Sequence, residues 1–191
     1  MKKISLILLL VSFILSSCKE QVKGESKTDS SVTKKEVTSK GQSAVVDKVS
    51  DPNALQVAMS LDDFKTLVVA VKAAGVEDAL VNAGPLTVFA PVNGAFDKLP
   101  EGTVSTLLKP ENKSKLAFIL TNHVAPANYP IKTLEKNIRK NRKLYMASGK
   151  YLEVTKKGDD LYVGGTKILK SVKVSNGWVH VIGDVLVPSD K

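Results

Sequence analysis

The hydrophobic pattern of this chain changes its period about halfway along, and this change most limits the folds that the chain can adopt. In the first half, five large apolar residues recur at helical spacing: Leu61, Phe64, Leu67, Val68 and Val71. In the second half, short alternating runs between glycine turns predict strands at 144–146, 151–155, 161–163, 168–174, 178–182 and 185–187. The Asn176-Gly177 pair between two of these runs is a strong hairpin signal. Helices followed by strands favour an α+β domain over a doubly wound parallel sheet.

The first seventeen residues have the features of an export signal. Two lysines precede an apolar run, Ile4–Leu15, and a helix of about 12 residues is too short to span about 30 Å of hydrocarbon. The only cysteine of the chain, Cys18, follows directly, so the segment resembles a bacterial lipoprotein signal peptide. We expect Cys18 to be lipidated and to anchor the protein in a bacterial cell envelope, on the periplasmic or cell-surface face of the outer membrane. The alternatives are an ordinary signal peptide with an incidental thiol and a short buried core helix.

A polar segment separates this signal from the part of the chain that can fold. Residues 19–44 contain six lysines, four acidic residues and no aromatic residue, and their only large aliphatic side chains are three valines. That is too little apolar surface to offset the entropy of ordering, so we expect a flexible tether. The predicted organisation is a signal peptide (1–17), a lipidated cysteine with its tether (18–45), and a single domain (46–191).

Two motifs far apart in the chain resemble the signatures of the fasciclin domain. The first is Thr87–Phe96 (TVFAPVNGAF), and the second is Asn176–Ile182 (NGWVHVI). Between them, Ile119–Val124 (ILTNHV) is similar to the segment that ends in the family's Tyr-His pair. The resemblance covers roughly residues 46–189. It implies a wedge-shaped β-sandwich flanked by several short helices, in a secreted or membrane-anchored protein that serves adhesion and cell-surface or matrix binding.

The resemblance assigns structural roles to nine motif residues: Thr87, Phe89, Pro91, Asn93, Phe96, His123, Asn176, Gly177 and His180. The chain departs from the family pattern at four positions. Val92 and Gly94 replace the commoner Thr and Glu, Ser171 stands where many members have the Asp of another proposed integrin motif, and Asn122 stands where the family usually has Tyr. That Tyr is half of a pair implicated in integrin binding in animal members, so integrin recognition is not carried over to this chain.

The residues that could support catalysis are few. His123 and His180 are the only histidines, and a metal site needs three or four ligands, so we interpret both as structural hydrogen-bonding residues. The chain has no Gly-x-Ser-x-Gly nucleophile motif, no phosphate-binding glycine loop and no His-Glu-x-x-His. We therefore expect no enzyme activity, no metal and no cofactor.

A run of basic residues is the most prominent candidate for ligand binding: Lys132, Lys136, Arg139, Lys140, Arg142 and Lys143. Such a run can attract polyanions, although a solvated face that keeps a sheet edge soluble is the alternative interpretation. Asn122 and Tyr129 bound a loop that we add as a candidate contact. The four tyrosines and Trp178 fit either an exposed binding patch or strand packing, and no stacking signature of specific nucleic-acid binding is present.

Taken together, these features predict a lipid-anchored adhesion or binding module. Its expected partners are the membrane, through the lipid, and surface polysaccharide (anionic polysaccharide included) or a matrix or cell-surface protein. We expect a monomer or weak self-association. Two alternatives stay open. A periplasm-facing lipoprotein that binds a small hydrophobic ligand would show a deep apolar cavity, and a hydrolase would show a cleft with a perturbed carboxylate or His beside a nucleophile.

Overall fold

The chain divides into two units, Met1–Thr38 and Ser39–Lys191. The computed structural model describes residues 51–81 and 84–188 of the second unit. The expected signal peptide (1–17) and the expected lipidated cysteine and tether (18–45) lie outside the described residues, so both stay predictions. Among the described residues, no helix is long and apolar enough to cross a membrane.

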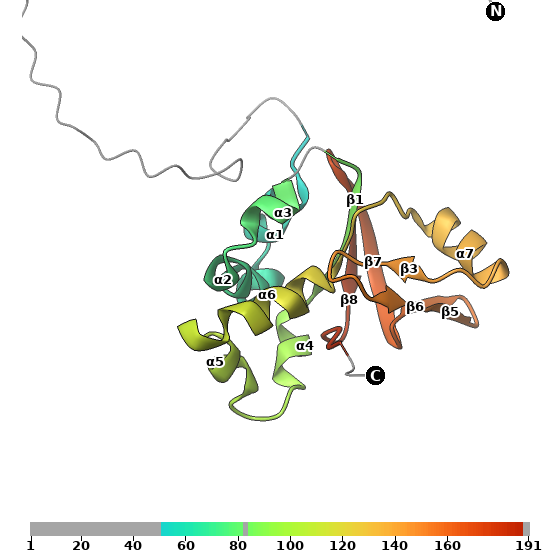
Figure 1. The fold of residues 1–191 in the computed structure, drawn as a ribbon. Helices are drawn as coiled ribbons and strands as arrows, with labels where there is room; N and C mark the ends of the chain where they lie inside the picture. The colour runs from blue at the N-terminus through green and yellow to red at the C-terminus, as the bar shows by residue number, and fades with distance from the viewer. Residues whose placement is uncertain (1–50, 82–83, 189–191) are drawn as a thin grey trace, which may run out of the picture. The chain divides into compact units, whose positions relative to one another are not determined.

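Short helices make up most of the first half of the described chain (Figure 1). They are α1 (Ala54–Ser60), the 3₁₀ turn η2 (Asp62–Phe64), α2 (Lys65–Ala74), α3 (Glu77–Val81), α4 (Asn93–Asp97), α5 (Thr103–Leu107), η3 (Pro110–Asn112) and α6 (Lys113–Thr121). Local signals set several of their ends. Asn53 and Gln56 form a capping box before α1, and Gly75 ends α2 in the left-handed conformation (φ 66°), as its position after the apolar repeat predicts.

The strands form one six-stranded sheet and one two-stranded sheet. The large sheet has the order β2-β1-β8-β7-β6-β5, in which β1 and β8 are parallel and all other pairs are antiparallel. Its strands are β1 (Leu86–Pro91), β2 (Val124–Ala125), β5 (Val154–Lys157), β6 (Asp160–Val163), β7 (Thr166–Val174) and β8 (Gly177–Ile182). The small sheet pairs β3 (Leu144–Tyr145) with β4 (Tyr151–Leu152), and α7 (Ile131–Arg139) precedes it in the chain.

The two signature motifs lie side by side in the sheet. Strand β1 carries the first and β8 the second, and they pair in parallel from Leu86 opposite Gly177 to Pro91 opposite Ile182. Only glycine fits at position 177, where β8 runs close to β1, because an added Cβ would collide with the carbonyl oxygen of Leu86. Asn176 binds the helical layer from the same turn: its Oδ1 accepts from the amide of Ala54 (3.1 Å) and its Nδ2 donates to the carbonyl of Leu80 (2.8 Å).

Two hydrophobic cores hold these layers together. The first core lies between the helices and one face of the sheet, and includes Leu67, Val71, Leu116 and Val179. The second core collects residues from β1, β2, β3, β5, β6, β7 and β8 and from α7, so the sheet curls around it. The expected α+β class is confirmed. The expected sandwich takes the form of one curled sheet, because β7 pairs with both β6 and β8, and its register with β8 is irregular between Ile168 and Lys170. Both cores lie within Ser39–Lys191, which therefore contains the packing that a domain needs to fold by itself.

One expected strand is absent from the described sheet. The apolar run Val185–Val187 was predicted as the last strand, and this prediction is wrong, because these residues pair with no strand. The backbone of Leu186 is bonded to side chains instead. Its amide donates to Nε2 of His123 (2.8 Å), and its carbonyl accepts from Nδ2 of Asn122 (3.0 Å).

Candidate functional site

Helix α7 has one apolar and one basic face. Ile131, Leu134 and Ile138 pack against the second core. At about 100° per residue, four basic residues fall on the opposite side within an arc of about 100°, and all are exposed. We call this group the basic face: Lys132, Lys136, Arg139 and Lys140.

The positive charge of the described domain is concentrated around this helix. Residues 132–157 contain nine Lys and Arg against two Glu, whereas the other described residues contain nine against eleven Asp and Glu. The net charge is thus +7 on one segment and −2 on the rest. Both glutamates of the segment are paired, Glu135 with Lys156 (3.1 Å) and Glu153 with Lys143 (2.8 Å). The basic face forms no ion pair with any described residue, so its charge is uncompensated.

An open groove of about 730 Å³ lies beside the β3–β4 hairpin, and we call it the hairpin groove. Lys143, Lys150, Tyr151 and Glu153 line it. The ring of Tyr151 is 64 % exposed and lies 5.4 Å from the ring of Tyr145, which is 47 % exposed. Lys143 belongs to both the predicted basic run and this groove. The Lys143 ammonium holds the pKa of the Glu153 carboxyl below its usual value, so Glu153 stays ionised beside it.

Asn122 and Tyr129, the two loop residues expected to contact a ligand, are less exposed than the basic run. Asn122 is fully buried beneath the hairpin groove, where its Oδ1 accepts from the hydroxyl of Ser148 (2.9 Å) and its Nδ2 donates to Leu186. With both ends of its amide bonded, Asn122 offers no free group to a ligand. Tyr129 is half-buried against the second core. Arg142 is exposed beside the basic face.

His123 is a buried, neutral hydrogen-bonding residue. Its Nδ1 donates to the carbonyl of Ile119 (2.8 Å), and its Nε2 accepts from the amide of Leu186 (2.8 Å). A carbonyl can only accept and an amide can only donate, so the contacts select the neutral tautomer with the proton on Nδ1. Burial lowers the pKa of His123 from 6.5 to about 4 despite the bond to Ile119, which acts in the opposite direction.

His180 is also buried and bonded on both sides. Its Nε2 donates to the carbonyl of Tyr129 (2.8 Å), and its Nδ1 accepts from the hydroxyl of Ser171 (2.7 Å). The ring stacks with Phe89 and with Trp178, whose ring centroids lie 5.4 and 6.3 Å away. Burial lowers the pKa of His180 as well. The Ser171–His180 pair has the composition of a nucleophile–base dyad, but His180 has no exposed surface for a substrate to reach.

The remaining motif residues position β1 and its flanking turns. Thr87, Phe89 and Pro91 are buried in β1, and Phe96 is buried in α4. The Asn93 side chain joins α4 to the start of α2, because it accepts from the amide of Thr66 and donates to the carbonyl of Asp62. Within the described ranges, no group of three or more His, Cys, Asp and Glu side chains could hold a metal ion.

The sequence left the tyrosines undecided, and the hairpin groove was not predicted from it. The exposure of Tyr145 and Tyr151 depends on their pairing across β3 and β4, two strands of only two residues each. Two residues are too few for an alternation of buried and exposed side chains to be recognised in the sequence. By contrast, the apolar spacing of Ile131, Leu134 and Ile138 was present in the sequence and could have shown that the basic run is one face of a helix.

Comparison with known proteins leads to the same family as the two sequence motifs. The family model of the Fasciclin domain matches residues 62–188. Protein sll1483 from Synechocystis is 41 % identical over 151 residues, which cover 77 % of this chain and 81 % of that protein. Transforming growth factor-beta-induced protein ig-h3 from Sus scrofa is 32 % identical over 75 % of this chain and 21 % of its own length. Immunogenic protein MPB70 from Mycobacterium bovis is 37 % identical over 56 % of this chain and 52 % of its own length. The chain belongs to the fasciclin-domain family.

Proposed function

We propose that this protein is a lipid-anchored, non-catalytic binding module that attaches to anionic polysaccharide through its basic face and hairpin groove. The family is known in adhesion and extracellular proteins, and its domains are generally non-enzymatic adhesion modules. This background supports a binding role at the cell surface or in the matrix, and the surface chemistry of the chain suggests the ligand.

The observation that carries the proposal is the separation of charge. A net charge of +7 on residues 132–157 beside −2 on the other described residues creates a directional field rather than a generally basic surface. A solvated face that only maintains solubility does not need the charge on one segment. A polyanion approaching this domain is attracted to α7 and β5.

The hairpin groove adds a surface suited to sugar rings. Exposed aromatic rings can stack on the apolar faces of sugars, and Tyr151 presents such a ring in the groove that Lys143 and Lys150 also line. The exposed ring of Tyr145 lies against that of Tyr151. A carboxylated polysaccharide in this groove would contact both lysines and the ring of Tyr151. Many weak contacts of this kind gain strength when anchored copies on one cell bind one polymer.

Binding of residues 39–191 to immobilised polygalacturonate, measured across a salt series, tests the proposal. The test variant changes Lys132, Lys136, Arg139 and Lys140 to Gln, which preserves helix propensity. The control variant changes four exposed lysines of the helical layer to Gln: Lys65, Lys72, Lys109 and Lys113. Both variants lose four positive charges, so net charge alone cannot separate them.

We expect the wild type to bind at low salt, binding to weaken steadily as salt rises, and the basic-face variant to lose at least tenfold in affinity. The control variant should lose much less, and Tyr151→Ala should weaken binding without changing its salt dependence. Equal losses in the two lysine variants would show that the basic face has no special role. Binding to duplex DNA and lipopolysaccharide, tested in parallel, shows whether a carboxylated sugar polymer is preferred.

A further inference from the structure

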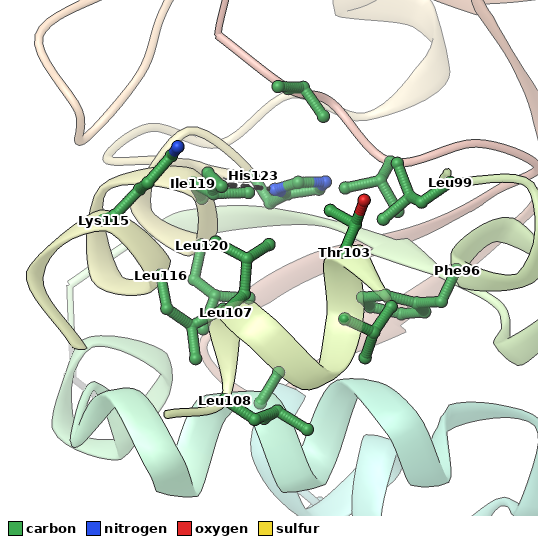
Figure 2. Close-up of a pocket in the computed structure, with 14 residues that line it drawn as sticks. Phe96, Leu99, Thr103, Leu107, Leu108, Lys115, Leu116, Ile119, Leu120 and His123 are labelled. Carbon is green, nitrogen blue, oxygen red and sulfur yellow. Dashed lines mark hydrogen bonds between the residues drawn. The ribbon is translucent and has the colours of Figure 1, made fainter. Parts of the chain in front are cut away.

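A second cavity lies in the helical layer, away from the basic face. It occupies about 160 Å³ between α4, α5 and α6, and Figure 2 shows the side chains around it. We call it the α5–α6 pocket. Its walls are formed by apolar side chains that include Phe96, Leu107, Leu116 and Ile119. An apolar cavity of about 150 Å³ stays dry and accepts a guest the size of benzene, so this one is large enough for about six carbon atoms.

The few polar groups of the pocket lie in a distinct arrangement. In Figure 2 the Lys115 amine and the Thr103 hydroxyl point to the side on which the His123 ring lies, whereas Leu108, Leu116 and Phe96 lie on the other side. Lys115 is exposed and forms no ion pair with any residue in the described part of the chain. The pocket therefore combines an apolar interior with an uncompensated cation at its rim.

His123 closes part of the wall without adding charge. Both ring nitrogens are occupied, by the carbonyl of Ile119 and the amide of Leu186, and burial lowers the pKa of the ring to about 4. At neutral pH the ring is uncharged and has no free hydrogen-bonding atom for a guest. Lys115 is thus the only charged residue among those that line the pocket.

We propose that the α5–α6 pocket binds a small apolar monocarboxylate, with about six tail carbons in the cavity and the carboxylate beside Lys115. This is the arrangement usual for small-molecule sites, in which a mostly apolar cavity holds the body of the ligand and a few polar groups fix its orientation. The pocket shares no residue with the basic face and only Val187 with the hairpin groove, so the basic-face variant and the Lys115 variants test the two proposals separately.

Heptanoate is the matching probe, because it has six carbons beyond its carboxylate. Burial of six carbons corresponds to a dissociation constant on the order of 0.1–1 mM. Phenylacetate, which has a single ring in place of the chain, shows whether the cavity prefers a linear or a cyclic acid. Heptan-1-ol and heptylamine have the same tail with a neutral or cationic head.

The experiment titrates each probe into residues 39–191 and follows methyl NMR shifts of Leu and Ile together with binding heat. We expect heptanoate to shift the methyl signals of Leu107, Leu116 and Ile119. Lys115→Gln should weaken heptanoate binding about threefold to fivefold, the range for an exposed ion pair, and leave heptan-1-ol unchanged. Lys115→Glu should weaken heptanoate binding further, and Lys109→Gln, which changes a neighbouring exposed lysine outside the pocket, should have no effect.

The half-buried side chain of Leu107 lines the pocket from α5. Leu107→Trp should therefore fill the cavity and abolish binding of every probe. Because the Lys115 variants change an exposed helical position, their result stands even if Leu107→Trp is misfolded. Absence of heptanoate binding at 10 mM would overturn the proposal. Methyl shifts confined to residues outside the pocket would overturn it too, and so would equal affinity for heptanoate and heptylamine.

Discussion

The buried His123 should make the stability of this domain depend on pH between about 7 and 4. The unfolded chain carries His123 with its ordinary pKa of 6.5, whereas the folded chain holds it at about 4. The unfolded state therefore binds the proton first as the pH falls, so acid favours unfolding. The stability is fully present above pH 6.5 and is lost progressively as the pH falls toward 4.

The size of the effect follows from the shift. At 1.36 kcal/mol per pKa unit, the difference between 6.5 and about 4 corresponds to about 3 kcal/mol in full. At pH 4.5 most of it, about 2 to 3 kcal/mol, is already lost. The cause of the lowered pKa is burial of the ring. The contacts agree with a neutral ring, because a second proton would occupy Nε2, the atom that now accepts from the amide of Leu186 (2.8 Å).

Urea denaturation of residues 39–191 at pH 7.5, 6.5, 5.5 and 4.5, followed by circular dichroism, measures this dependence. The comparison is His123→Gln, whose amide can donate to Ile119 and accept from Leu186 but does not titrate. This variant is expected to be less stable at pH 7.5 and to lose about 2 to 3 kcal/mol less than the wild type on acidification. Its remaining acid sensitivity belongs to His180, whose pKa is also lowered, and to carboxylates. If the two proteins lost the same free energy of unfolding between pH 7.5 and 4.5, the assignment of acid sensitivity to His123 would be refuted.

Two substitutions in β1 and β8 test how the signature motifs hold the sheet. Gly177→Ala should prevent folding or cost more than about 3 kcal/mol in urea denaturation, because the added Cβ meets the Leu86 carbonyl at 1.7 Å, whereas Gly94→Ala, with open space around it, should be nearly neutral. A stable Gly177→Ala protein would contradict the parallel register of β1 and β8. Thr87→Val should cost about 1–3 kcal/mol in thermal unfolding, since the hydroxyl both donates to the Ala127 carbonyl (2.8 Å) and accepts from the Tyr129 amide (2.9 Å). A loss below about 0.5 kcal/mol would mean that water replaces the hydroxyl at both partners.

The parts of this fold that were predictable from the sequence are those with local causes. The α2 helix ends where Gly75 can adopt positive φ, and the Asn176-Gly177 pair turns β7 into β8. The run Leu86–Ala90, closed by Pro91, has the composition of a buried strand, and all six residues of β1 are buried. In each case a short stretch of chain contains both the signal and its consequence.

The parts that could not be predicted depend on partners distant in the chain. Val185–Val187 has the composition of a strand, but the Leu186 amide and carbonyl are bound by His123 and Asn122, more than sixty residues earlier. Asn122 was expected near a ligand and is buried for the same reason. The exposure of Tyr151 and the presence of the α5–α6 pocket likewise depend on how separate elements meet.

Asn122 and His123 are neighbours in the chain, and both bind the backbone of the same residue, Leu186. His123 binds the amide of Leu186 and lines the α5–α6 pocket, while Asn122 binds the carbonyl of Leu186 and lies beneath the hairpin groove. Val187, the next residue, lines both cavities. A displacement of this segment therefore changes the wall of the pocket and the edge of the groove together. Protonation of folded His123, which begins only near pH 4, would remove one of the two bonds that fix this segment.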